Sequence, residues 1–216
     1  DVELSAAQEQ IAQPEPLSDT TEKLPPPEEK ITHSRLKSEP GPETGPEQQT
    51  GVAHEEAPEF RLASIVFADR AMVVTQVPAG SSDPLTSQHL VLISNLLRSI
   101  DIDIQQSPTV TFFNWPMLRT PGFDQGEAAA RQASQAFVNG QKSKQAVPFV
   151  LLMGEVPGRY LQADFESFAS SRGRLNKQAE QPQLLTHSLD ELLAKPSLKA
   201  TVWSDFQALR MYLVQA

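Results

Sequence analysis

Several features are missing from this sequence, and each absence excludes a class of protein or a kind of site. There is no cysteine, which excludes disulfide bonds and thiolate metal sites. No apolar run approaches the roughly 18 residues of a membrane-spanning helix. Residues 1–4 show neither the basic start nor the apolar stretch of a secretory signal peptide. The lack of cysteine leaves the redox compartment undecided, and we expect a cytoplasmic protein. Because there is no initial methionine, we also expect that natural residues precede Asp1.

The charge is distributed unevenly. Residues 1–60 hold 14 acidic and 4 basic residues, a net charge of -10, and 9 of the 18 prolines. Residues 61–216 hold 13 acidic and 14 basic residues, a net charge of +1. The first part cannot bury enough apolar surface to offset the entropy lost on ordering. We expect a disordered acidic arm over residues 1–58 and one domain over 61–216, nearly neutral and therefore weak in binding nucleic acid.

The domain alternates strand and helix patterns. Short apolar runs predict strands at 62–67 and 71–75, joined by a turn at Asp69-Arg70, and further strands at 110–113, 147–153 and 184–186. Apolar residues at helical spacing predict helices at 84–100 and 127–137, the first starting at Asp83-Pro84 and the second ending near Asn139-Gly140. A short helix is expected at 161–168.

The C-terminal part adds two helices. Ser188 and Glu191 have the spacing of a capping box, which predicts a short helix through Leu193. Pro196 favours a new helix start, and Trp203 shares its helical spacing with other apolar residues, so we expect Trp203 in the core. Together the elements predict an α/β fold, a three-layer α/β/α domain with a small, largely parallel sheet.

No catalytic, cofactor or metal-binding signature is present, and the four histidines are widely separated. One pattern leaves open the alternative that this protein is an enzyme. Gly154-Glu155-Val156-Pro157-Gly158 and Thr186-His187-Ser188 each follow a predicted strand and resemble two elements of uracil-DNA glycosylases. The spacing between them is much shorter than in those enzymes, and no Pro follows His187. A third possibility is a scaffold whose acidic arm binds a basic partner.

A second resemblance involves the C-terminal stretch. This stretch contains, in order, a Ser-capped turn at Ser188, a Leu, Pro196, a basic residue with an Ala, and Trp203. This order resembles the end of the psi subunit of bacterial DNA polymerase III holoenzyme. The strand at 70–75, the helix to Ile100 and the strand at 110–113 are similar to earlier parts of that family, with an insertion at about 114–146.

This resemblance implies a non-catalytic accessory subunit of the clamp loader, active in DNA replication. Members bridge the tau/gamma subunit to the chi subunit, and chi contacts single-stranded-DNA-binding protein. The family grips tau/gamma with an N-terminal segment that contains a Trp, but here no Trp precedes Trp115. The acidic arm would then act as a tether.

Such a role requires an apolar surface on a rigid domain. The loop Trp115-Pro116-Met117-Leu118 is apolar enough to be a partner-binding site, and so is any outer face of the last helix. For Trp115 itself, a place in the core and a place in an interface are equally compatible with the sequence.

Overall fold

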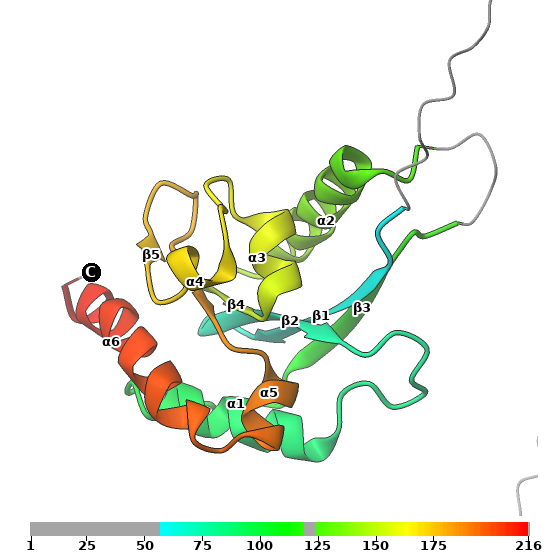
Figure 1. Ribbon diagram of the computed structural model, residues 1–216. Coiled ribbons are helices and arrows are strands. Elements are labelled where there is room, and N and C mark those ends of the chain that lie inside the picture. The colour runs from blue at the N-terminus through cyan, green and yellow to red at the C-terminus, as the bar shows by residue number, and fades with distance from the viewer. Residues whose placement is uncertain (1–56, 119–123, 216) are drawn as a thin grey trace, which may run out of the picture. The chain divides into compact units, whose positions relative to one another are not determined.

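The computed structural model describes residues 57–118 and 124–215 (Figure 1). The arm predicted for 1–58 therefore lies outside the described residues, except for its last two. The strands are β1 (Phe60–Phe67), β2 (Ala71–Val77), β3 (Thr109–Trp115), β4 (Val150–Met153), β5 (Leu175–Asn176) and β6 (Gln183–Thr186). The helices are α1 (Ser87–Arg98), α2 (Glu127–Lys142), α3 (Glu155–Leu161), α4 (Phe168–Ser171), α5 (Leu189–Ala194) and α6 (Leu198–Gln215).

The six strands form one sheet in the order β3-β1-β2-β4-β6-β5. The hairpin predicted at Asp69-Arg70 is confirmed, with β1 and β2 antiparallel in the register Phe67 opposite Ala71. Asp69 takes a left-handed conformation in this turn, at φ 57°. A turn this short can only join antiparallel strands, whereas parallel strands need a long crossover.

The predicted α/β class is confirmed, but the sheet is mixed rather than largely parallel. The β2–β4 and β4–β6 pairs are parallel, and the β1–β2, β1–β3 and β5–β6 pairs are antiparallel. The parallel part is confined to the centre, where helical crossovers connect the strands. Antiparallel pairs occupy both ends of the sheet: β3, β1 and β2 at one end, and β6 with β5 at the other. The prediction did not include the short β5.

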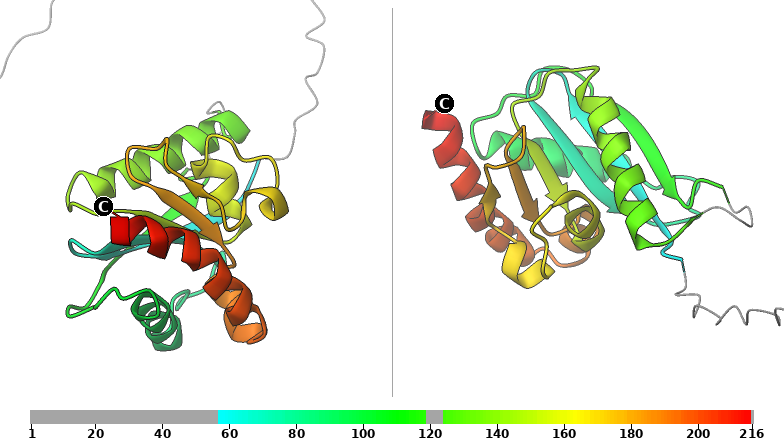
Figure 2. Two further views of the ribbon diagram at one scale, coloured as in Figure 1. Left: turned by 90° about the vertical axis from the view of Figure 1, so that its left-hand side faces the viewer. Right: turned by 90° about the horizontal axis from the view of Figure 1, so that it is seen from above.

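Helices cover both faces of the sheet, which confirms the predicted three layers (Figures 1 and 2). On one face, α1, α5 and α6 pack against strand residues such as Ile65, Val73 and Leu151. On the other face, α2 and α3 pack against Leu62 and residues that alternate with the first set. All four residues of β4 are buried, as expected for a strand covered on both sides.

Two helix boundaries differ from the prediction. The first helix begins at Ser87, three residues later than expected, because Thr86 and His89 form its capping box. Pro84 lies in the preceding loop. Helix α2 continues through Gly140 to Lys142, since an isolated glycine lowers the stability of a helix without ending it.

The helix predicted at 161–168 is wrong. The chain turns from β4 directly into α3 through Gly154, whose φ of 104° only glycine adopts readily. Pro157 lies in the first turn of α3, where its missing N–H costs nothing. A Cβ on Gly158 would lie 2.8 Å from a methyl carbon of Leu185 in β6, so glycine permits this close helix–sheet contact.

Candidate protein-docking site

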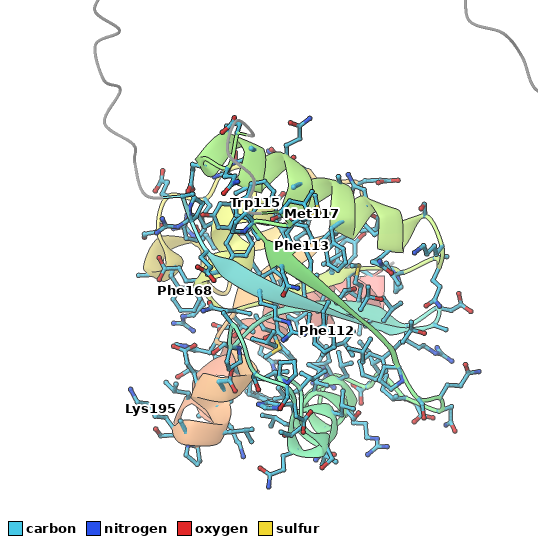
Figure 3. All side chains as sticks on the ribbon, turned by 90° about the vertical axis from the view of Figure 1, so that its right-hand side faces the viewer. Phe112, Phe113, Trp115, Met117, Phe168 and Lys195 are labelled. Carbon is cyan, nitrogen blue, oxygen red and sulfur yellow. The ribbon has the colours of Figure 1, made fainter. Side chains whose placement is uncertain are left out.

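The fold divides the predicted site at 115–118: Trp115 is buried, Pro116 is half-buried, and Met117 and Leu118 are exposed. Trp115 is the last residue of β3, only 6% exposed, and its ring stacks on Phe113 at 6.4 Å beneath α2 (Figure 3). Its indole Nε1–H donates to the Gln125 carbonyl oxygen at 3.3 Å. Met117 and Leu118 are exposed. The most accessible part of the predicted site is therefore this pair, which follows the buried Trp115 in the chain.

A second apolar surface lies on the outer face of α6. Trp203, Met211 and Val214 are 50%, 63% and 81% exposed. With the half-buried Gln207 they are spaced four, four and three residues apart, which places them on one side of the helix. Both Figure 1 and Figure 2 show α6 at the margin of the domain, with no other described element over its outer side. We call these four residues the α6 stripe.

The inner side of α6 holds the helix firmly to the sheet. Val202, Phe206 and Leu209 are buried in the core. Between them the buried Asp205 accepts two hydrogen bonds from the Arg172 guanidinium, at 2.7 and 2.8 Å, and one from the Thr186 hydroxyl at 2.7 Å. Because its carboxylate is fully partnered, the buried charge is tolerated. The α6 stripe is thus displayed on a fixed helix.

A buried histidine ties α1 to α5 in the same layer. The Thr86 backbone N–H donates to His89 Nδ1 at 3.0 Å, so this nitrogen is unprotonated. The proton then lies on Nε2, which donates to the Asp190 carboxylate at 2.9 Å. His89 therefore completes a helix cap and joins two helices, and it is not free for ligand binding.

The two glycosylase-like elements come together at the carboxyl ends of β4 and β6, where they pack closely. The Gly154 N–H donates to the Thr186 carbonyl oxygen at 2.9 Å, and a Cβ on Gly154 would lie 3.2 Å from the Ser188 Cβ. The Glu155 carboxylate pairs with Arg159 at 3.2 Å. The two elements are thus in direct contact at Gly154, Thr186 and Ser188.

His187 points into packed surroundings. Its ring lies edge-on to Phe168, with centroids 5.2 Å apart, and its Nδ1 is 3.4 Å from the Glu191 carboxylate. Burial of Glu191 favours its neutral form. The Ser188 backbone N–H and hydroxyl, together with His187, outweigh this and lower the pKa of Glu191 below its usual value. This carboxylate acts as a helix cap, which confirms the predicted capping box.

A cavity of about 460 Å³ lies between the segment after α3 and β5. Its charged lining residues are Asp164, Glu166, Arg174 and Lys177. A second cavity of about 260 Å³ lies between the β1–β2 turn and the ends of α1 and α6. Neither cavity includes His187 or Glu155, so the two glycosylase-like residues do not converge on a described hollow.

Within residues 57–118 and 124–215, no group of three or more His, Asp or Glu side chains is arranged to hold a metal ion. None of the helices in this part of the chain combines the length and apolarity that a bilayer crossing requires. The surfaces that stand out are the α6 stripe and the Met117–Leu118 pair, both suited to binding another protein.

The prediction that Trp203 is a core residue is wrong. Its helical spacing with Val202 and Phe206 indicated burial, but the ring lies beyond the edge of the buried face. The signal that could have identified the α6 stripe is the second apolar series 203, 211, 214, which runs beside the first. Compared with models of known protein families, the sequence matches none, and comparison with curated proteins gives no match either.

Proposed function

We propose that this chain is a non-catalytic, protein-binding subunit of a bacterial DNA polymerase III clamp loader, of the psi kind, and that the α6 stripe contacts a chi-like partner. The observation that carries the proposal is the exposure of Trp203, Met211 and Val214 on one side of a well-anchored helix. Large apolar side chains on a fixed surface, and Trp above all, are typical of the centres of protein interfaces.

The resemblance to the psi family supplies the identity of the partner. The stretch that carries it, from Ser188 to Phe206, includes α5 and the first part of α6 with Trp203, the first residue of the stripe. In that family chi contacts single-stranded-DNA-binding protein, so this chain would reach that protein indirectly, in the cytoplasm during replication. Met117 and Leu118 provide a second, smaller apolar contact. The tau/gamma contact belongs to an N-terminal segment and is not assigned to the described domain.

Co-expression of the full chain with the chi subunit of the same organism tests the proposal. We expect a stoichiometric complex on gel filtration, and weak binding to DNA alone. Trp203→Glu should remove the complex, because a charge at the centre of an apolar interface loses its solvation without gaining a partner. Val91→Glu is the matched control, since Val91 is an exposed apolar residue on α1, and it should leave the complex intact.

Two results would overturn the proposal. One is separate elution of this chain and chi at all ratios. The other is cleavage of a uracil-containing oligonucleotide that His187→Ala abolishes, which would favour the glycosylase alternative. A complex that survives Trp203→Glu but not Met117→Glu would keep the partner and move the interface to the Met117–Leu118 pair.

A further inference from the structure

The two edges of the sheet differ in how well they are protected. Strand β5, at one end of the strand order, has only two residues and is followed by Lys177. Strand β3, at the other end, has seven residues and pairs with β1 without a bulge, from Phe60 opposite Trp115 to Val66 opposite Thr109. Natural proteins shorten, charge or bend an edge strand to prevent pairing with another chain. In this protein β5 is short, whereas β3 is long and regular, and among the described strands only β1 pairs with it.

The side chains of β3 also favour pairing. Its sequence, Thr-Val-Thr-Phe-Phe-Asn-Trp, has no proline and no charged residue and is rich in residues that prefer strands. Phe113 and Trp115 are buried against α2, whereas Phe112 points to the opposite face and is 38% exposed. Figure 3 shows β3 nearest the viewer, with no other described helix or strand in front of it.

We propose that β3 pairs with β3 of a second copy of this chain, antiparallel, to form a two-fold dimer. Phe112 is the middle residue of the seven. A two-fold axis through it places Phe112 opposite its own copy, Thr111 opposite Phe113, and Thr109 opposite Trp115. Directly opposed residues lie on the same face in an antiparallel pair. This register therefore joins the two sheets and keeps the helices of each copy on matching faces.

The environment of Phe112 suits this contact. The Arg61 guanidinium lies 4.6 Å from the centre of its ring, on a residue of β1, and the Arg61 side chain also donates to the Ser81 carbonyl oxygen at 2.9 Å. The ring is thus positioned before a second copy arrives. Since β3 carries no charge, a two-fold axis opposes no like charges across the strands, which is the usual obstacle to self-pairing.

The segment of this chain that precedes β1 is a poorer occupant of the same edge. Half of all the prolines lie in the first 60 residues, together with a net charge of -10. Proline cannot donate to a ladder of backbone hydrogen bonds, and acidic residues have low strand propensity. A second β3 offers a run of strand-forming residues, so we assign the edge to the second copy.

A single introduced thiol tests the register, because residues 1–216 contain no cysteine. In the full chain, Phe112→Cys should give a disulfide-linked dimer rapidly under mild oxidation, because directly opposed Cβ atoms in an antiparallel pair are about 4.5–5.5 Å apart. Met117→Cys, exposed but outside the strand, is the control and should cross-link at least about tenfold more slowly.

Analytical ultracentrifugation of the full chain completes the test. The wild-type chain should show a reversible monomer–dimer equilibrium, and Phe112→Lys should weaken it at least about tenfold by opposing two ammonium groups. A monomer at all concentrations would overturn the proposal, whether the edge is empty or covered by the chain's own N-terminal segment. Equal cross-linking rates for the two thiol variants, or a dimer unaffected by Phe112→Lys, would also overturn it. This proposal is independent of the chi-like partner.

Discussion

The two tryptophans occupy opposite kinds of surroundings. Trp115, at the end of β3, packs against Phe113 beneath α2, and its indole N–H is hydrogen-bonded. Trp203, on α6, is half exposed on the far side of a helix whose other side is buried. Both belong to apolar segments of the sequence. What separates them is whether another element covers them, and that depends on the whole fold.

The contrast indicates different roles for the two regions. The region around Trp115 contributes mainly to the stability of the domain, because its aromatic rings are shielded from water. The α6 stripe contributes less to stability, because Trp203, Met211 and Val214 keep half or more of their surface in water. Stability and partner binding should therefore respond separately to substitutions in the two regions.

The largest effect on stability is expected from Trp115→Ala. Removing a buried Trp leaves a cavity and typically costs about 3–5 kcal/mol in the free energy of unfolding. Urea denaturation followed by circular dichroism measures this change. A loss below about 1 kcal/mol would show that the 115 region is not part of the stabilising core and would remove the contrast with Trp203.

Asp205→Ala should lower the free energy of unfolding by about 3 kcal/mol, because it removes the buried carboxylate that bonds α6 to Arg172 and Thr186. The substitution leaves the Arg172 guanidinium and the Thr186 hydroxyl without their common acceptor, and breaking a buried ion pair is strongly destabilising. Leu193→Ala, on the surface of α5, is a control with an effect within about 1 kcal/mol. If Asp205→Ala is equally mild, α6 is not held rigidly and cannot display a fixed stripe.

A smaller, pH-dependent effect is expected at Tyr160, which joins α3 to α2 beside the Trp115 region. Burial, and then the hydrogen bond of the Tyr160 hydroxyl to Glu127 at 2.9 Å, raise the pKa of Tyr160 from 10.0 to about 12. A raised pKa adds stability that is complete below pH 10 and disappears as the pH rises through 12.

Tyr160→Phe should therefore lower the free energy of unfolding by about 1–2 kcal/mol at neutral pH, where the wild-type hydroxyl donates to a carboxylate. The difference between the two proteins should shrink above pH 10. Denaturation curves at several pH values measure it. A difference that stays constant from pH 8 to pH 11.5 would mean that the hydroxyl does not titrate as its surroundings indicate.

The smallest effect on stability is expected at Trp203 itself. Trp203→Ser should change the free energy of unfolding by less than about 1 kcal/mol, because half of the side chain is already in water in the folded state. Thermal denaturation of this variant beside Trp115→Ala compares the two regions directly. A loss similar to that of Trp115→Ala would place Trp203 among the stabilising residues.

Much of the fold could be predicted from the sequence, because it depends on local patterns. The hairpin at Asp69-Arg70, the capping box at Ser188 and Glu191, and the doubly covered β4 each follow from short-range rules. The mixed sheet could not be predicted, because nothing local to β3 specifies an antiparallel partner. Helix α3 was missed because Pro157 and Gly158 indicate a turn unless the close contact with β6 is known.

The candidate site was only partly predictable for the same reason. The sequence shows that 115–118 is apolar, but burial of Trp115 depends on α2, whose residues follow it in the chain. The sequence also shows two apolar series on α6, and only the position of the sheet decides which one is covered. Which apolar residues remain at the surface is therefore a tertiary property.

Calorimetric titration of the chi subunit into the full chain, and into its Trp203→Glu and Met117→Glu variants, tests the central claim most directly. We expect Trp203→Glu to weaken binding by at least about 30-fold, the effect of losing a central interface residue worth about 2 kcal/mol. Met117→Glu should weaken it by less than about fivefold. Wild-type affinity in the Trp203→Glu variant would contradict the claim that the α6 stripe is the docking surface.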